Sequence, residues 1–241
     1  HEEDSTVLFS QPAVVQYYLT VISPYGITGG QGWYANGSIA YATLNTDVVD
    51  HGNGTRRVFL NWSGDASGTN YTQSNQILMD GNKTAIAVWG TQYRLIMSTN
   101  FGTTNPSVGE HWYDTGSVIP ISATAPSVVD GEQYVWLGWT GTGTISYTGM
   151  NNPASVTMNS PINETAAWRH EYRLRMATNY GTTTPSVGDH WYEAGSNVVI
   201  NATPPSTVPG ERYVWNGWVG TGTISYTGMD NPAAVTMNSP I

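Results

Sequence analysis

The stretch YVWLGWTGTGTISYTGM at residues 134–150 returns at residues 213–229 with only two changes. The match extends on both sides, because residues 93–162 align with residues 172–241 at a constant offset of 79 without a gap. This alignment contains 51 identities in 70 pairs. Self-similarity at a fixed period is typical of repeat architectures. The sequence therefore predicts a tandem duplication.

A third, diverged copy precedes these two. Gly32-Trp33-Tyr34 corresponds to His111-Trp112-Tyr113, and VFLNWSG at residues 58–64 corresponds to VWLGWTG at residues 135–141. We predict an N-terminal tail (1–16) followed by three modules, and these are called the first repeat (17–92), the second repeat (93–171) and the third repeat (172–241).

Each repeat has the pattern of a β structure. In the second repeat, short segments rich in Val, Ile, Tyr, Trp and Thr are separated by Gly, Pro and Asn clusters. We expect strands over 93–97, 117–123, 133–139 and 154–158, with Tyr134, Trp136 and Gly138 on one face. No window shows a helical period, so almost no helix is expected. The prediction is an all-β chain of three small immunoglobulin-like sandwiches, with a β-grasp-like module as the alternative.

Aromatic residues recur at matching positions of the repeats, and large aromatics dominate small cores. We therefore expect these side chains to form the module cores: Trp33, Phe59, Trp62, Trp112, Trp136, Trp139, Trp191, Trp215 and Trp218. A sugar-binding platform built from Trp112, Trp136 and Trp139 is the competing interpretation, which the repetition disfavours.

Composition excludes several functional classes. The 241 residues include one lysine, seven arginines and 17 acidic residues, for a formal net charge of -9. A chain without a basic field is a poor candidate for binding nucleic acid. No apolar run is long enough to span a membrane. The absence of cysteine excludes disulfide scaffolds and thiol catalysis.

The pattern YxLxM, WY, YVWxGWxG, VTMNSP and TAxW resembles the divergent internalin-type B-repeat modules of prokaryotic surface proteins. The residues that carry the resemblance include Tyr93, Trp112-Tyr113, Gly116, Gly138-Trp139 and Trp168. Such modules are common in adhesins and stalks, so the resemblance implies a bacterial or archaeal cell surface more firmly than it implies an activity.

The ends of the repeats differ. The first and second repeats close with short apolar segments, 82–89 and 163–168, whereas the third stops at Ile241, the counterpart of Ile162. We expect the missing strand to come from the tail of another copy, as in donor-strand pili. The predicted donor residues are Thr6, Val7, Leu8, Phe9, Ala13, Val14 and Val15, with Pro12 interrupting them. The alternative is that the sequence is a window of a longer repeat array.

Seven N-x-[ST] sequons predict N-linked glycans on an exported protein, and a chain that begins with His1 rather than Met fits a processed N-terminus. The acceptors are Asn36, Asn53, Asn61, Asn70, Asn82, Asn163 and Asn201.

No catalytic constellation stands out. His111 and His190 each follow a carboxylate, but their repetition favours a turn or packing feature over an acid–base or metal site. Asp65 is a weak candidate for a calcium loop. We expect no enzyme, no cofactor and no metal site.

The resulting hypothesis is an extracellular, glycosylated structural subunit that polymerises with itself, head to tail, into a pilus-like filament. The partners are other copies of the chain and covalent glycans, with no nucleic acid and no membrane span. The alternative is a carbohydrate-binding or adhesive stalk fragment of a larger cell-surface repeat protein.

Overall fold

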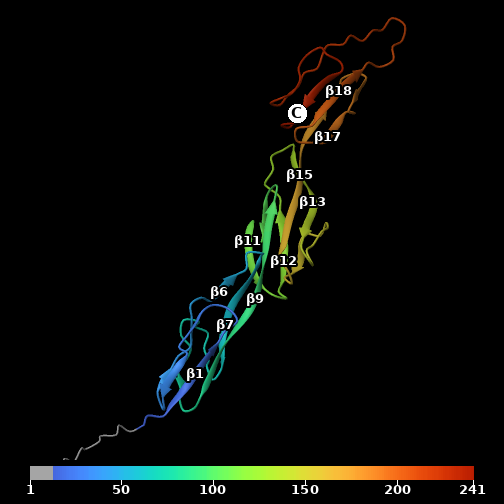
Figure 1. Ribbon diagram of the computed structural model, residues 1–241. Coiled ribbons are helices and arrows are strands. Elements are labelled where there is room, and N and C mark those ends of the chain that lie inside the picture. The colour runs from blue at the N-terminus through green and yellow to red at the C-terminus, as the bar shows by residue number, and fades with distance from the viewer. Residues whose placement is uncertain (1–12) are drawn as a thin grey trace, which may run out of the picture. The chain divides into compact units, whose positions relative to one another are not determined.

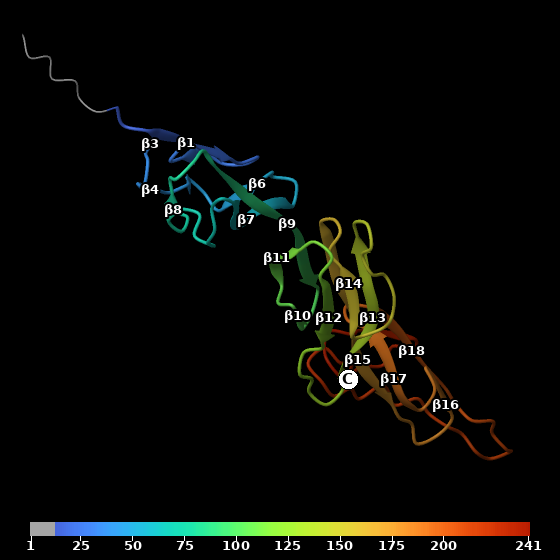
Figure 2. The same ribbon diagram turned by 90° about the horizontal axis from the view of Figure 1, so that it is seen from below.

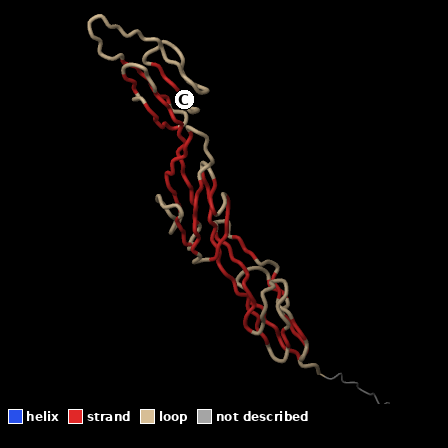
Figure 3. The backbone as a smooth tube through the Cα atoms, turned by 180° about the vertical axis from the view of Figure 1, so that it is seen from behind, coloured by secondary structure: helices blue, strands red, loops and turns tan. Residues whose placement is uncertain are grey.

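A computed structural model describes residues 13–241, and these residues are all β, as expected. Figure 3 shows strands joined by loops, and no helix occurs within this described range. The all-β class is therefore confirmed. The immunoglobulin-like assignment and the three-module division stay predictions.

The strands follow the repeats of the sequence, with bounds as follows. The first repeat contains β1 (Gln16–Ile22), β2 (Thr28–Gly29), β3 (Gly32–Ala35), β4 (Ile39–Ala40), β5 (Thr43–Leu44), β6 (Val48–Asp50), β7 (Thr55–Gly64) and β8 (Ile77–Leu78). The second contains β10 (Thr103–Asn105), β11 (Gly109–Asp114), β12 (Val118–Thr124), β13 (Glu132–Thr142) and β14 (Ala154–Thr157). The third contains β16 (Thr182–Thr184), β17 (Gly188–Glu193), β18 (Asn197–Thr203) and β19 (Ala233–Thr236).

Two long strands cross the predicted repeat boundaries without a break (Figure 1). They are β9 (Lys83–Thr99) and β15 (Ile162–Met176). Each begins as the closing strand of one repeat and continues as the opening strand of the next. Both belong to one sheet whose main order is β13-β15-β9-β1-β3, with β11 on β9 and β17 on β15. Strand β7 also pairs with β9, and β6 pairs with β7.

The chain divides into two compact units. The first unit comprises His1–Leu95, Trp112–Ser117 and Thr157–Ile162. The second comprises Ile96–His111, Val118–Val156 and Asn163–Ile241.

In the first unit, the first repeat is an open sandwich. Leu19 and Val21 of β1, together with Trp62 of β7, pack from the large sheet. They meet the smaller pairs β2-β5 and β4-β8, which contribute Leu44 and Ile77. The core therefore lies between two β layers, as expected of strands that alternate buried and exposed side chains.

In the second unit, the third repeat has the same plan. Leu174 and Met176 of β15 pack against Val198 and Ile200 of β18. Strand β18 is the middle of the three-stranded sheet β16-β18-β19, and Figure 2 shows it next to β17 and β16. The equivalent small sheet of the second repeat is β10-β12-β14.

One predicted alternation is wrong. Tyr134, Trp136 and Gly138 do not share a face, because the register of β13 against β15 shifts between Trp136 and Gly138. Leu137 is the extra residue of this β-bulge, and Gly138 has φ of 107°. A bulge moves the following residues to the opposite face. Trp139 therefore joins Trp136 on the inner face, and their rings meet edge to face at 5.7 Å.

The expected core positions also need correction. Trp62 and Trp139 are buried, whereas Trp33, Trp191 and Trp215 are exposed, Trp33 by 65%. Phe59, Trp112, Trp136 and Trp218 are half-buried. The aromatic signal did not distinguish a side chain in a covered core from one on the outer face of a sheet, such as Trp33, or from one on an inner face that no strand covers, such as Trp215.

Candidate assembly site

In the second repeat, the first half of β15 is a central strand. It pairs antiparallel with β13, with Trp168 opposite Trp136 and Ala166 opposite Trp139. On its other side it lies beside β9. Ala166 is fully buried, and the ring of Trp168 packs on Trp136 with centroids 4.8 Å apart. This closing strand therefore joins the two sides of the sheet and covers the aromatic core.

A side-chain clamp holds the closing strand in place. The Trp168 N–H donates to Asn100 Oδ1 at 2.9 Å, and Asn100 Nδ2 donates to the Trp168 carbonyl at 2.7 Å. The two bonds reproduce the pattern of a strand pair with one amide side chain. Asn100 follows β9, so the clamp fixes the closing strand against the opening strand of the same repeat.

The third repeat contains nearly the same sequence but lacks this strand pairing. Residues 211–221 correspond to β13, yet they form only an isolated bridge between Trp218 and Gly228. No described segment pairs with them where β15 pairs with β13. Val214 is 71% exposed and Val219 is 86% exposed. A strand needs a neighbour to accept and donate its backbone hydrogen bonds, so the same residues stay irregular when that neighbour is missing.

The position of the closing strand is an open groove in the third repeat, with a volume of about 570 Å³. We call it the slot. Residues 177–180, 202–205 and 213–219 line it, together with Asn231. The ring centroids of Tyr180 and Tyr213 are 5.3 Å apart. Their counterparts in the second repeat, Phe101 and Tyr134, have ring centroids 5.1 Å apart. The walls of the slot thus keep the arrangement that surrounds a closing strand.

The clamp residue is also in the slot. Asn179 is the counterpart of Asn100, lines the slot and is exposed. Its side chain forms no hydrogen bond with any other residue of the described range, whereas Asn100 forms two with Trp168. Neither asparagine was among the predicted site residues, although the offset of 79 connects them.

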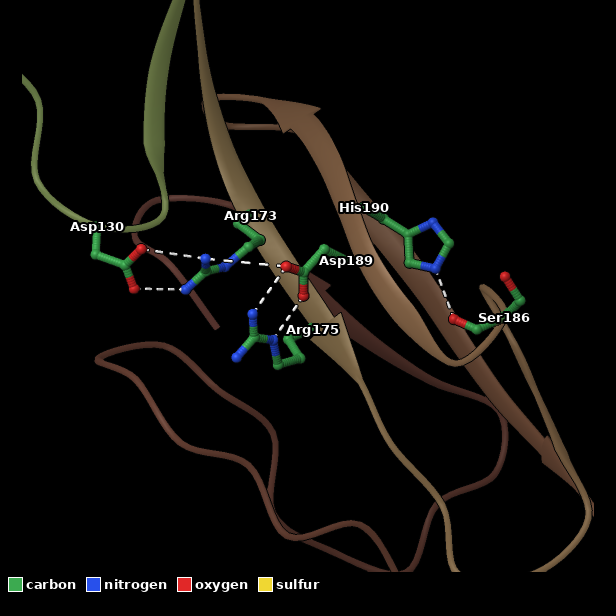
Figure 4. A network of polar contacts seen from close by, with 6 residues as sticks. All are labelled: Asp130, Arg173, Arg175, Ser186, Asp189 and His190. Carbon is green, nitrogen blue, oxygen red and sulfur yellow. Dashed lines mark hydrogen bonds and ion pairs between the residues drawn. The ribbon is translucent and has the colours of Figure 1, made fainter.

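Polar contacts surround the boundary between the second and third repeats (Figure 4). Asp130 binds the Arg173 guanidinium at 2.7 and 3.2 Å, and Asp189 binds Arg175 at 2.6 and 2.8 Å. These arginines hold the pKa of both carboxyl groups below the ordinary aspartate value. The pairs are surface contacts, which orient side chains more than they stabilise a fold.

The predicted donor residues are only partly described. Thr6, Val7, Leu8 and Phe9 lie outside the described range. Ala13, Val14 and Val15 directly precede β1 and are exposed, Val14 by 69%. The Val15 carbonyl accepts a hydrogen bond from Asn36 N–H, as Thr91 does from Thr115 and His170 does from Ala194. These residues therefore enter the first repeat in the same register as the closing strands enter the second and third.

The other candidate sites have structural partners. His111 Nε2 donates to the Ser107 carbonyl at 2.6 Å. His190 Nε2 donates to the Ser186 carbonyl at the same distance (Figure 4). Asp65 accepts the Thr84 N–H at 2.7 Å. Across residues 13–241, no group of three or more His, Asp or Glu side chains is placed to hold a metal ion. Each of these side chains thus caps backbone near its own strand or turn.

The sequon asparagines differ in exposure. Asn61 and Asn201 are half-buried, and Asn61 Nδ2 donates to the Trp62 carbonyl at 2.8 Å. The remaining five are exposed: Asn36, Asn53, Asn70, Asn82 and Asn163. A glycan needs an accessible side-chain nitrogen, so these five are the better acceptors.

Glu164 is an unexpected buried charge in the closing strand. Its side chain is fully buried, accepts the Tyr147 N–H at 2.7 Å through Oε1, and leaves Oε2 without a hydrogen bond. Burial raises the pKa of this carboxyl group. The first repeat has Ala85 at this position, so the sequence pattern gave no signal for it.

No family model, no curated protein and no solved structure matches this chain. The described residues include no helix that is long and apolar enough to cross a bilayer.

Proposed function

We propose that this protein is a structural subunit of an extracellular filament, in which a strand from one copy fills the slot of the next. One observation carries the proposal. Residues 132–142 form a strand where β15 lies beside them, and the equivalent residues 211–221 form none where that neighbour is missing. The slot keeps the aromatic walls and the asparagine clamp that hold a closing strand, so its occupant is a strand.

The residues before β1 supply the most direct occupant. In β9 and β15, a closing strand continues into the opening strand of the following repeat. Val14 and Val15 occupy the matching place ahead of β1 and are exposed. A copy that places its tail in the slot of another copy extends this arrangement from one chain to the next. The contact joins two different surfaces, so it propagates as a filament.

The magnitude of the contact is sufficient for assembly. A strand donated by the tail (1–16) forms roughly eight backbone hydrogen bonds, each worth about 0.5–1.5 kcal/mol net. Burial of each apolar side chain adds about 1.5–3 kcal/mol. Ordering the tail and joining two molecules opposes several kcal/mol of this gain. The balance favours a lasting joint.

A disulfide between copies tests the proposed register. Val135 pairs with Arg169 in β13 and β15, and their counterparts are Val214 and Val14. The chain has no cysteine, so the double variant Val14→Cys with Val214→Cys can form only designed bonds. Under mild oxidation we expect a ladder of covalent dimers and longer polymers on a denaturing gel. Val14→Cys with Val219→Cys is the matched control, because Val219 is also exposed but out of register.

Deleting residues 1–12 from the full chain is the second test. Electron microscopy should show filaments of the intact protein and none of the truncated form. Filaments of the truncated protein would show that the tail does not supply the strand. If the slot is filled by a later segment of a longer chain, the intact protein stays monomeric and its cysteine pair gives no ladder.

The exposed Trp33 ring supports a second candidate, an adhesive or carbohydrate-binding stalk. A large aromatic face open to solvent suits stacking on a sugar ring. Binding to a glycan array that is lost in Trp33→Ala, with no filaments in the intact protein, would favour this candidate.

A further inference from the structure

A cation–π contact crosses the boundary between the first and second repeats within the first unit. The Arg56 guanidinium lies over the Trp112 ring, with Cζ 4.5 Å from the centroid. Arg56 Nε donates to Gln92 Oε1 at 2.8 Å, and Gln92 Nε2 donates to Asp114 Oδ1 at 2.9 Å. Arg56, Gln92 and Trp112 therefore form one connected group, through which β7 contacts β11 of the following repeat.

The same three residue types recur, but they are divided between the third and first repeats. The β7–β9 register pairs Arg56 with Gln92, and the β13–β15 register pairs Gln133 with Glu171. The counterpart of Arg56 in the third repeat is Arg212. At the start of the first repeat, the counterpart of Gln92 is Gln16 and that of Trp112 is Trp33.

The boundary between the second and third repeats does not use this group. Its residues at the three positions are Gln133, Glu171 and Trp191, and Gln133 Nε2 donates to Glu171 Oε2 at 2.7 Å. The arginine is therefore not a general requirement of the repeat. Arg212 is present where the next repeat in a filament would be the first repeat of another copy, and that repeat carries the matching Gln16 and Trp33.

Both halves of the divided group are accessible. Trp33 is 65% exposed, and its only ring contact in the described range is edge-on with Tyr18 at 5.1 Å. Arg212 is exposed and forms no ion pair or hydrogen bond with another described residue. An exposed indole face and an exposed guanidinium are complementary surfaces.

A backbone donor at the same end of the first repeat has a different kind of partner from its counterparts. The N–H groups of Arg94 and Arg173 donate to the carbonyls of Gly54 and Gly131 in the preceding repeats. The first-repeat counterpart, Tyr18 N–H, donates instead to Asn82 Oδ1 at 2.9 Å. A side chain thus occupies the place that a loop of a preceding repeat takes at the two internal boundaries, and Gly210 is the corresponding loop residue of the third repeat.

We infer that Arg212 of one copy lies over Trp33 of the next copy and donates a hydrogen bond to its Gln16, which makes this group a specificity element of the head-to-tail contact. This inference rests on the proposed function, because it requires the two copies to meet at the slot. Its partner is a second copy of this chain, selected by an arginine–indole contact in addition to the donated strand.

The test is a double-mutant cycle on filament assembly. Sedimentation gives the concentration of monomer in equilibrium with polymer for the intact protein, Arg212→Ala, Trp33→Ala and the double variant. Loss of a cation–π contact predicts that each single variant raises this monomer concentration about 2- to 30-fold. The double variant should raise it no further than the larger single effect, because both substitutions remove the same contact.

Two controls separate the contact from the filament itself. Trp191→Ala removes an exposed tryptophan at the equivalent position of the third repeat, where Gln133 stands at the position of Arg56, and should leave assembly unchanged. The cysteine pair at positions 14 and 214 should still form its ladder in the Arg212→Ala background. Additive effects of Arg212→Ala and Trp33→Ala, or no effect of either, overturn the contact while the filament stands. An intact protein that stays monomeric overturns both.

Discussion

The amide side chain of Asn100 holds the backbone of Trp168 through two hydrogen bonds, of 2.9 Å to its N–H and 2.7 Å to its carbonyl. These residues are 68 positions apart, and they connect the two ends of the second repeat. The third repeat keeps the amide, as Asn179, without a strand to bind.

Replacing the two asparagines should therefore have different effects. Asn100→Ala leaves the N–H and carbonyl of Trp168, a residue only 8% exposed, unpaired and should lower the free energy of unfolding by about 1–3 kcal/mol. Asn179→Ala should leave this free energy unchanged, since its amide has no partner to lose. Urea denaturation below the concentration of assembly measures both. Sedimentation should then show weaker assembly for Asn179→Ala, and equal destabilisation by the two variants would contradict the assignment.

Glu164 predicts a stability that falls as pH rises. Burial raises the pKa of its carboxyl group in the folded state, so the folded protein holds the proton more tightly than the unfolded chain. Between the ordinary glutamate pKa and the raised value, the folded state binds more protons, and the free energy of unfolding decreases with pH. Above the raised value this contribution becomes constant.

Glu164→Gln should remove that dependence. The amide oxygen still accepts the Tyr147 N–H, and no buried charge forms, so the variant should be more stable by about 1–3 kcal/mol at neutral pH. Thermal unfolding between pH 4 and 8 measures the effect. Glu193→Gln, which changes an acidic residue outside the core, serves as control. Parallel pH profiles of Glu164→Gln and the unmodified protein would show that Glu164 does not cause the slope.

The bulge in β13 predicts an intolerant glycine. Gly138 has φ of 107°, and a Cβ there would lie 2.8 Å from the Gly149 carbonyl oxygen. Gly138→Ala should therefore lower the free energy of unfolding by about 1–3 kcal/mol or more. Gly81→Ala is the control, because open space surrounds that position. Comparable stability of the two variants in urea denaturation would argue against the bulge.

Glycan occupancy should follow exposure. Mass spectrometry of the protein from its native host should find glycans among Asn36, Asn53, Asn70, Asn82 and Asn163 and none at Asn61. The Asn61 side-chain nitrogen already donates to the Trp62 carbonyl inside a strand. Modification of Asn61 with the exposed sites empty would contradict this order.

Much of the fold could be predicted from the repeats. The β composition, the Gly and Pro punctuation and the offset of 79 residues predicted an all-β chain, and the expected strands over 117–123, 133–139 and 154–158 overlap β12, β13 and β14. Which side chains face the core was harder to predict. Alternation failed at Leu137 because a bulge adds one residue, and aromatic content did not show that Trp33 faces solvent.

The candidate site could be predicted only in outline. The difference between the ends of the repeats was visible in the sequence, but the clamp was not. Asn100 and Trp168 meet because β9 and β15 are neighbours in the sheet, and a single asparagine in a loop carries no local signal of that contact. The contact of Arg56 with Trp112 was hidden for the same reason.

The sequence by itself determined the repeat, the β character of each segment and the positions at which the repeats differ. Only the tertiary structure decided whether a given segment becomes a strand. Residues 132–142 and 211–221 are nearly identical, yet one forms β13 and the other stays irregular. The reason is that a strand completes its hydrogen bonds with a neighbour, so its structure depends on whether another segment lies beside it.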